Sequence, residues 1–555
     1  MIRTFSALKQ RRGRRAAAVA SVSALALGLV SAGFVLSPAA AAAASNTLVV
    51  NAGQTLRPVT HVATGSLYGL ANATQPTLAL AQAIKPNTFV QMPAGGKQQP
   101  TGDISVVAPT AVSAGAKLVN RLSDYYAGWP YQFSWNTWTP FITSQINTMK
   151  SSSYYNSISA YELWNESDNT WKSANGTYEN FWTTTFRQVR SLDATKPIQG
   201  PSFSDNISDM ENFLRNAVAT NTVPDVLAWH ELSSSSKIAS DVAKVQALED
   251  QLGISRRPIA IEEYAAPSEV GLPGPLVGYI SKFERLGIRD AELAFWNQSG
   301  TLGDLLTARG GSPNAAYWLY TWYAAMSGNM VVTNPPAQTG IDGFAAVPAA
   351  RNEVSIMTGN CNGSCAVTVN GLNALSLGGT VNVKVEQTTS QGRTVASAGP
   401  TTIANSTYTP SGGSISVPIT MAANNAYRIT ITPGSGGPTT SPPTSPTTGP
   451  TTSSTPPSGS GCSASVTLNQ WNGGFVATAR VTAGSAPLTG WTTGVTLPSG
   501  AAVTSTWNAT ASGSAGAVSF TNVGYNGTVP AGGYTEFGFQ GTGTGPSGTP
   551  TCTAR

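Results

Sequence analysis

Carboxylates that follow apolar runs are the residues of this sequence best suited to chemistry. Glu166 ends the run ISAYELWNE (158–166), and the adjacent Glu262 and Glu263 fall near the end of PIAIEEY (258–264). A pair of carboxyl groups can cut a glycosidic bond, because one protonates the leaving oxygen while the other, ionised, attacks or stabilises the anomeric carbon. A shared apolar cleft would move their pKa values apart. Structural salt bridges at strand ends are the alternative interpretation.

The elements that would position these carboxylates are short apolar runs, which alternate with segments of helical spacing between residues 60 and 330. The helical spacing is clearest in the stripe Tyr178, Phe181, Trp182, Phe186 and Val189. The apolar runs are SLYGLA (66–71), TFVQM (88–92), AKLVNRL (116–122), ISAYELWNE (158–166), PIQGPSF (197–203), DVLAWHEL (225–232), PIAIEEY (258–264) and AELAFWNQ (291–298).

Eight strands that alternate with helices predict a parallel sheet, and their number favours a closed (β/α)8 TIM barrel over an open doubly wound sheet. The first run is not followed by a glycine-rich phosphate loop, which argues against dinucleotide binding. Because the strands of a barrel end on one face, Glu166 and the Glu262–Glu263 pair are expected to meet across its mouth. Strand alternation would let only one of Glu262 and Glu263 point into that mouth.

Further changes of pattern predict five segments. Residues 336–432 alternate apolar and polar positions between turns, as in an antiparallel β-sandwich, and residues 46–60 have the same pattern and could add a strand to it. The next stretch, residues 433–461, is rich in Pro, Thr, Ser and Gly, which predicts an extended linker. The predicted boundaries are 1–44 for a leader, 45–335 for the barrel, 336–432 for the accessory sandwich, 433–461 for the linker and 462–555 for a small all-β domain.

The N-terminus has the layout of a secretory signal peptide, with a basic head, an apolar run and an alanine-rich end. A membrane anchor is disfavoured because no basic stop-transfer flank follows the apolar run. Six of the 31 basic residues and none of the 26 acidic ones lie in residues 1–44, so the mature chain would carry 25 basic and 26 acidic residues. We therefore expect a secreted, extracellular protein without a nucleic-acid partner, and without membrane attachment once the leader is removed.

The cysteine count predicts disulfides. In an exported chain, an even number of cysteines favours disulfide bonds. Cys462 and Cys552 bracket the last segment and are expected to pair, as are Cys361 and Cys365. Zinc binding is disfavoured because neither of the two histidines lies near a cysteine in the sequence. We expect neither a metal nor an organic cofactor.

The two carboxylate segments resemble those of the retaining (β/α)8 glycoside hydrolases of clan A. ELWNE (162–166) is similar to the clan's fourth-strand motif, in which an Asn precedes the acid/base Glu, and IAIEEYA (259–265) is similar to the seventh-strand segment that carries the nucleophile. The resemblance implies that Glu166 is the acid/base and Glu263 the nucleophile. Glu262 stands where many relatives have a small or polar residue, and is the second choice for the nucleophile.

The same resemblance implies four substrate-binding residues. Asn165 would contact the 2-hydroxyl of the sugar, and His230 in DVLAWHEL would lie near the nucleophile. Tyr264 is the aromatic residue that follows the nucleophile, and Trp296 would stack under the sugar, whose C–H face is apolar. A packed core histidine and a packed core tryptophan are the alternatives for His230 and Trp296.

At the level of families, residues 46–432 most resemble glycoside hydrolase family 39, with family 30 as the nearest rival. Family 39 includes β-xylosidases, α-L-iduronidases and enzymes that release α-L-arabinosides. The resemblance implies hydrolysis of xyloside or arabinoside linkages in hemicellulose.

Residues 462–555 are rich in Gly, Thr and Ser, nearly uncharged, and contain several aromatic residues. A row of exposed rings matches the flat apolar faces of a polysaccharide. The segment resembles a family 2 carbohydrate-binding module, which binds cellulose or xylan. The resemblance places Trp471, Trp507 and Tyr525 on the binding platform, whereas Trp491 matches a tryptophan that packs inward.

These expectations combine into a secreted O-glycosyl hydrolase of the retaining type, which degrades plant cell-wall polysaccharide and is tethered to cellulose by its module. Three alternatives remain: a non-catalytic carbohydrate-binding protein, a polysaccharide lyase, and a family 30-like endo-glycanase. A lyase acting on acidic glycans would favour a basic cleft, which the charge balance does not support.

Overall fold

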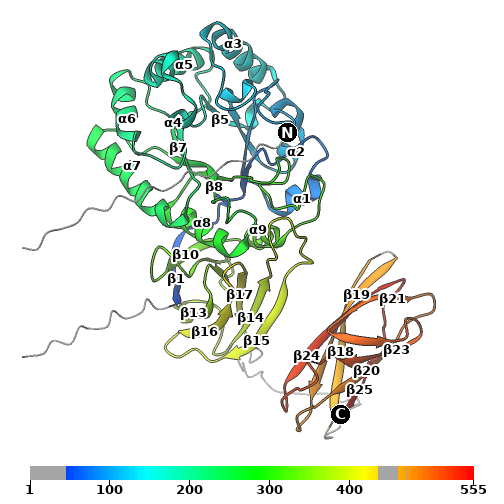
Figure 1. Ribbon diagram of the computed structural model, residues 1–555. Helices are drawn as coiled ribbons and strands as arrows, with labels where there is room; N and C mark the ends of the chain where they lie inside the picture. The colour runs from blue at the N-terminus through cyan, green and yellow to red at the C-terminus, as the bar shows by residue number, and fades with distance from the viewer. Residues whose placement is uncertain (1–45, 435–460, 472, 525) are drawn as a thin grey trace, which may run out of the picture. The chain divides into compact units, whose positions relative to one another are not determined.

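The computed structural model describes residues 46–434 and 461–555, except 472 and 525 (Figure 1). The predicted leader (1–44) and most of the predicted linker (433–461) lie outside these residues. The chain divides into two units, 1–440 and 441–555, which are described separately. Within the described ranges, no helix has both the length and the apolar composition that crossing a membrane requires.

The first unit contains the predicted barrel. Its eight parallel strands close into a ring, because the last pairs with the first (Ser66 with Leu293). Each of the eight predicted runs contributes one strand. The strands are β2 (Gly65–Leu67), β3 (Thr88–Gln91), β4 (Lys117–Arg121), β5 (Ile158–Glu162), β6 (Ile198–Phe203), β7 (Val226–Glu231), β8 (Ile259–Tyr264) and β9 (Asp290–Leu293).

Helices cover the outside of the barrel, and their ends follow from local sequence signals. Helix α5 turns its predicted apolar stripe inward and begins at Thr177, whose hydroxyl accepts a hydrogen bond from the Asn180 amide. Helix α7 ends at Gly253, which adopts the left-handed conformation that glycine favours. The helices are α1 (Leu78–Ala83), α2 (Ile104–Ser113), α3 (Trp135–Ser151), α4 (Ser167–Thr170), α5 (Tyr178–Leu192), α6 (Met210–Ala219), α7 (Ile238–Leu252), α8 (Pro273–Leu286) and α9 (Ala315–Ala325).

A nine-stranded sheet packs against α8 and α9 (Figure 1). Strand β1 pairs with β10 and β13, so residues 46–60 do belong to this sheet; the β1–β13 pair is parallel and the other pairs are antiparallel. Strands from both ends of the sheet contribute to one apolar core, as in a sandwich. The strands are β1 (Thr47–Pro58), β10 (Asn329–Asn334), β11 (Asp342–Val347), β12 (Val354–Gly359), β13 (Gly363–Asn370), β14 (Val381–Thr388), β15 (Thr401–Tyr408), β16 (Ile415–Met421) and β17 (Ala426–Pro433).

Buried ion pairs join this sheet to the barrel. Lys282 and Arg285 of α8 contact the Asp342 carboxylate of β11 at 2.9 and 2.8 Å. Removing one partner of such a buried pair is costly, because the other charge is left uncompensated. A disulfide between Cys361 and Cys365 forms within the sheet, as predicted.

The second unit is a small all-β domain. Two four-stranded sheets, β18-β19-β24-β21 and β22-β23-β20-β25, enclose a core that contains the inward-packed Trp491. The predicted disulfide between Cys462 and Cys552 joins the first and last strands. The strands are β18 (Cys462–Trp471), β19 (Gly474–Ala483), β20 (Trp491–Thr496), β21 (Ala502–Trp507), β22 (Ala509–Ser512), β23 (Ala517–Asn522), β24 (Tyr534–Thr542) and β25 (Thr551–Ala554).

Candidate active site

Glu166 lies just beyond β5 rather than at its end. The strand stops at Glu162, and Glu166 precedes α4 in the left-handed conformation (φ 49°), which is unusual for a residue with a side chain. Its amide donates a hydrogen bond of 2.8 Å to the Ser202 carbonyl of β6, which holds the turn in place. A strained backbone of this kind is common where a side chain must be aimed.

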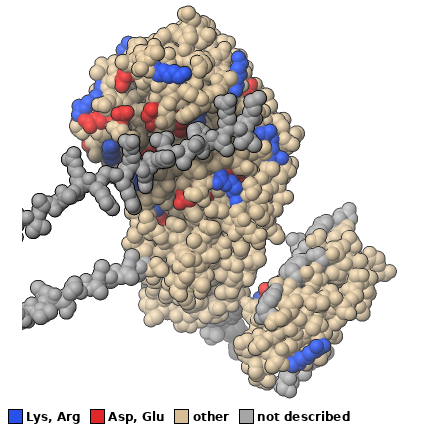
Figure 2. All heavy atoms as spheres, viewed as in Figure 1, with Lys and Arg blue, Asp and Glu red and all other residues tan. Residues whose placement is uncertain are grey.

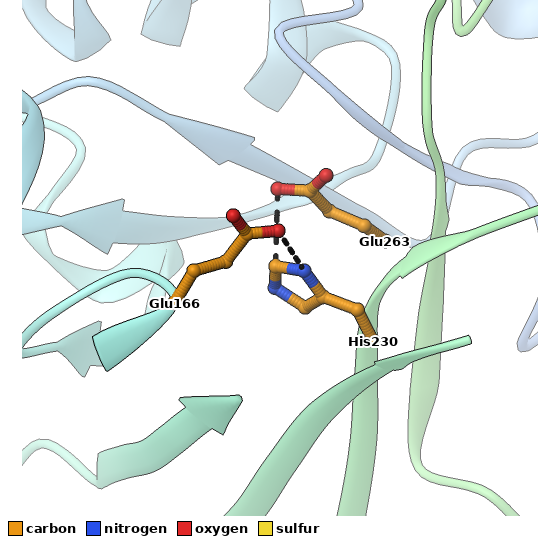
Figure 3. A group of neighbouring side chains, drawn as sticks. All are labelled: Glu166, His230 and Glu263. Carbon is orange, nitrogen blue, oxygen red and sulfur yellow. Dashed lines mark hydrogen bonds and ion pairs between the residues drawn. The ribbon is translucent and has the colours of Figure 1, made fainter. Parts of the chain in front are cut away.

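Glu166 and Glu263 point toward each other at the barrel mouth, and the His230 ring of β7 lies against both carboxylates (Figure 3). One side-chain ligand atom from each of these three residues lies within 4.8 Å of the others. The His230 Nδ1 is 3.2 Å from Glu166 Oε1, and its Nε2 is 3.8 Å from Glu263 Oε1. The fold therefore brings together two carboxylates that are about a hundred residues apart in sequence.

Glu262 also faces the barrel interior, so strand alternation does not put Glu262 and Glu263 on opposite faces, although only Glu263 of the two lines the cavity, as expected. Trp229 pairs with Ile261 but His230 pairs with Glu263, which leaves Glu262 as an extra, bulged residue in β8. A bulge interrupts the alternation of side chains, so two consecutive residues can point the same way. Glu262 Oε2 is 3.9 Å from His230 Nε2. Glu262 is fully buried and does not line the cavity, whereas Glu263 does.

Arg121 is a site residue that the sequence analysis missed. It ends β4 and is buried, with its Nε 2.8 Å from Glu162 Oε2 and its Nη1 2.6 Å from Glu263 Oε1. A buried guanidinium needs such partners, because an uncompensated charge inside the protein is costly. The signal in the sequence was a single arginine at the end of an apolar run, AKLVNRL.

The pKa of Glu166 lies below its usual value, opposite to the expectation for a resting general acid. Burial raises this pKa, but the hydrogen bond with His230 and the charges of His230 and Arg121 lower it by more. Burial lowers the pKa of His230, and the charge of Glu263 together with the hydrogen bond and charge of Glu166 raise it above its usual value. The directions of these two pKa shifts therefore favour a proton on His230 over one on Glu166.

The carboxylates open into a cavity of about 260 Å³. Asn165 lines it, and its Oδ1 is buried with no hydrogen-bond partner among the described residues, so it is free for a ligand hydroxyl. Trp296 lines the cavity and is 43% exposed, as expected of a stacking residue. Trp129, which the sequence analysis missed, lines it as well and is 54% exposed.

Tyr264 does not reach this cavity, which corrects the predicted substrate contact. Its side chain is fully buried, and its hydroxyl donates a hydrogen bond of 2.7 Å to the Ala63 carbonyl and contacts the Tyr320 hydroxyl. Because Tyr264 follows Glu263 in β8, its ring points out of the barrel, toward the surrounding helices.

The distances among Glu166, His230 and Glu263 would also suit one metal ion. However, the Arg121 guanidinium lies 2.6 Å from Glu263 and would repel a cation there. The donor set and its charges fit acid–base and nucleophilic chemistry better than metal binding.

The three predicted platform residues of the second unit lie at positions whose side chains are outside the described structure. Trp471 ends β18 and Trp507 ends β21, while Tyr525 is not described at all. Trp491 is fully buried, and its Nε1 donates to the Asn526 carbonyl at 2.8 Å, so it packs inward as predicted.

Comparisons with known proteins agree with this architecture. Residues 461–554 match the family described as Cellulose binding domain. The chain is 25% identical over 414 residues to the 3-O-alpha-D-galactosyl-alpha-L-arabinofuranosidase of Bifidobacterium longum subsp. longum, a match that covers 61% of this chain. It spans only about a third (36%) of that relative's length.

Two solved structures are similar to most of this chain. The GH39 enzyme of Xanthomonas axonopodis pv. citri shares the fold at 14% identity, with a TM-score of 0.52 over 72% of this chain and 100% of that one. The protein N2152 of Neocallimastix frontalis is 35% identical, with a TM-score of 0.67 over 70% of this chain and 99% of that one.

The fold and the paired carboxylates define a clan A glycoside hydrolase that carries a C-terminal family 2 carbohydrate-binding module. Within that class, the chain belongs to the same family as N2152 of Neocallimastix frontalis.

Proposed function

We propose that this protein is a secreted retaining glycosidase that releases arabinose- or xylose-containing units from plant cell-wall polysaccharide. The observation that carries the proposal is the pair of carboxylates Glu166 and Glu263, which have oxygens within 4.8 Å of each other at the barrel mouth. Retaining glycosidases hold their two carboxyl groups about 5–5.5 Å apart, whereas inverting enzymes need about 6.5–9.5 Å to admit a water molecule.

The reaction would proceed by double displacement. Glu263, paired with Arg121, attacks the anomeric carbon while Glu166 donates a proton to the leaving oxygen. A proton on His230 can reach Glu166 along their 3.2 Å contact. In the second step, Glu166 removes a proton from water, the water oxygen attacks the anomeric carbon, and Glu263 departs as a carboxylate.

Of the two proposed sugars, arabinose is supported by the name of the Bifidobacterium relative, an α-L-arabinofuranosidase. The neutral residues around Asn165 and the two exposed tryptophans also suit an uncharged sugar. A panel of aryl α-L-arabinofuranosides, β-xylosides, β-galactosides and β-glucosides would identify the sugar.

The assignment is tested by Glu263→Ala. We expect kcat to fall by at least about 10⁴-fold, and sodium azide to restore part of the turnover by forming a glycosyl azide of inverted configuration. Glu262→Ala is the matched control and should not be rescued by azide. Wild-type turnover in Glu263→Ala would refute the assignment, and an initial product of inverted configuration from the unmodified enzyme would refute retention.

The non-catalytic alternative predicts no turnover of any glycoside in the panel. A lyase predicts an unsaturated product that absorbs in the ultraviolet. Secretion is tested separately: the N-terminal sequence of protein recovered from the culture medium should begin near residue 45.

A further inference from the structure

A second and larger cavity, of about 550 Å³, lies at the same end of the barrel as the catalytic pair. Twelve residues line it, and they come from α4, the segment before α5, the start of α5, the end of β6 and the start of α6. Its walls include Trp171, Tyr178, Glu179, Asp209, Asn212 and Phe213.

The position of this cavity follows from the barrel topology. Phe203 is the last residue of β6, and Tyr178 and Met210 are the first residues of α5 and α6. The carboxyl ends of the strands and the amino ends of the following helices meet on one face of a barrel, where Glu166 and Glu263 also lie. Ser167, which lines the cavity, is bonded directly to Glu166.

The lining combines aromatic side chains with free polar groups. Trp171, Tyr178 and Phe213 contribute rings, with the Trp171 and Tyr178 centroids 5.9 Å apart. Sugars bind such surfaces because their C–H faces are apolar and their hydroxyls need hydrogen-bond partners.

The polar groups of the rim are available to a ligand. Asp209 and Asn212 are exposed, Glu179 is half-buried, and none of the three side chains has a hydrogen bond or ion pair with another described residue. The lining contains three carboxylates and no lysine or arginine, so it would disfavour an acidic sugar.

We propose that this cavity binds a neutral sugar unit of the polysaccharide on the leaving-group side of the cleaved bond. The inference rests on the proposed function, since it takes Glu166 as the group that protonates the leaving oxygen. The leaving part of the substrate must therefore lie beside Glu166. The next residue of the polypeptide, Ser167, lines this cavity. The cavity of about 260 Å³ that Glu166 and Glu263 both line would then hold the sugar that is released.

The test compares a substrate that reaches the cavity with one that does not. The double variant Asp209→Ala/Asn212→Ala removes two exposed polar groups and should leave the fold intact. In the full chain, we expect kcat/KM for soluble arabinoxylo-oligosaccharides to fall about five- to tenfold, because the loss of one or two hydrogen bonds weakens binding by that much. The value for an aryl glycoside should change by less than twofold.

Trp171→Phe is the second variant, because it keeps a ring while shortening the platform, and it should show the same selective loss. The matched control is Glu211→Ala/Arg215→Ala. It changes an exposed ion pair on α6, the helix that also carries Asn212, but outside the cavity. Equal losses on both substrates, or no loss on either, would overturn the cavity assignment.

Failure of the proposed function gives a different result, because the unaltered enzyme would then turn over neither substrate. In that case, calorimetric titration of the full chain with the same oligosaccharides tests the cavity directly. Weaker binding to the Asp209→Ala/Asn212→Ala variant than to the unaltered chain supports the cavity, and equal binding, or none to either, overturns it.

Discussion

At the residue scale, one guanidinium faces several carboxylates inside the barrel. Arg121 contacts Glu162 and Glu263, and Glu262 lies nearby. Burial raises the pKa of Glu162 well above its usual value and that of Glu262 to about 6, against the opposing charge of Arg121. Arg121 is therefore the buried positive charge that Glu162, Glu262 and Glu263 share.

The buried Glu231 gives the clearest pH prediction. Burial raises its pKa from 4.5 to about 8, although its Oε1 accepts a hydrogen bond from Trp229. The native state therefore keeps a proton that the unfolded state releases, so the free energy of unfolding should fall as pH rises from about 4.5 to about 8. Glu231→Gln keeps the hydrogen-bond acceptor and cannot ionise.

We expect Glu231→Gln to be more stable than the unaltered chain at pH 8, by an amount that grows between pH 5 and 8. Each pKa unit corresponds to about 1.4 kcal/mol, so the full effect is a few kcal/mol. Urea unfolding of the first unit at several pH values measures it. Glu211→Gln, in an exposed ion pair, is the control and should differ by less than about 1 kcal/mol at every pH. A constant difference between pH 5 and 8 would contradict the prediction.

At the element scale, the barrel could be predicted from the sequence because each strand is a distinct apolar run. The exact ends of the strands could not. Leu163 and Trp164 continue the apolar pattern of β5, yet they are buried by packing beyond the strand, which carries Glu166 into a loop. The bulge at Glu262 depends on the register between β7 and β8, which no local pattern specifies.

Long-range contacts also explain which site residues were missed. A lone arginine such as Arg121 usually forms a surface ion pair, and only the closed barrel brings it to Glu263. Tyr264 was misplaced for the same reason, since its partners, Ala63 and Tyr320, are distant in sequence.

The loop that carries Trp296 is held by Asp304, and the nine-stranded sheet supports Asp304 in turn. The Asp304 carboxylate accepts hydrogen bonds from the amides of Trp296 and Asn297, at 2.7 and 2.8 Å. Arg393, between β14 and β15, lies 3.6 Å from Asp304 and donates to the Pro267 carbonyl. The sheet therefore helps to fix a wall of the active-site cavity.

We predict that Arg393→Ala raises KM for an aryl glycoside about three- to tenfold, because the Trp296 loop loses a support. The free energy of unfolding should change by only about 1 kcal/mol, as expected for a partly exposed ion pair. Steady-state kinetics and urea unfolding measure the two effects. Arg351→Ala is the control, since Arg351 binds the Ala374 carbonyl elsewhere in the sheet. An unchanged KM, or a KM that also rises in the control, would contradict the prediction.

At the scale of the whole molecule, the charges are unevenly distributed. On the face shown in Figure 2, Lys, Arg, Asp and Glu side chains gather over the barrel, and the second unit carries few. A nearly uncharged surface suits contact with a neutral polysaccharide, and tethering raises the local concentration of the barrel at that surface. The first unit has its own cores, so it should fold without the second.

We therefore expect deletion of residues 441–555 to leave kcat/KM on a soluble aryl glycoside within twofold of the full chain. Adsorption to microcrystalline cellulose should fall at least tenfold, since the match to a cellulose-binding family lies in the deleted unit. Depletion of protein from solution at increasing cellulose concentrations measures adsorption.

A substitution separates platform binding from any general effect of the second unit. Trp471→Ala/Trp507→Ala should reproduce the loss of adsorption, because it removes two rings that are predicted to stack on sugar faces. Tyr534→Ala is the control: it is exposed in the same unit but stacks beneath Arg480, and it should adsorb normally. Full adsorption by the deletion variant would place cellulose binding in the first unit. Full adsorption by the double variant alone would leave binding in the module but move it away from the two predicted rings.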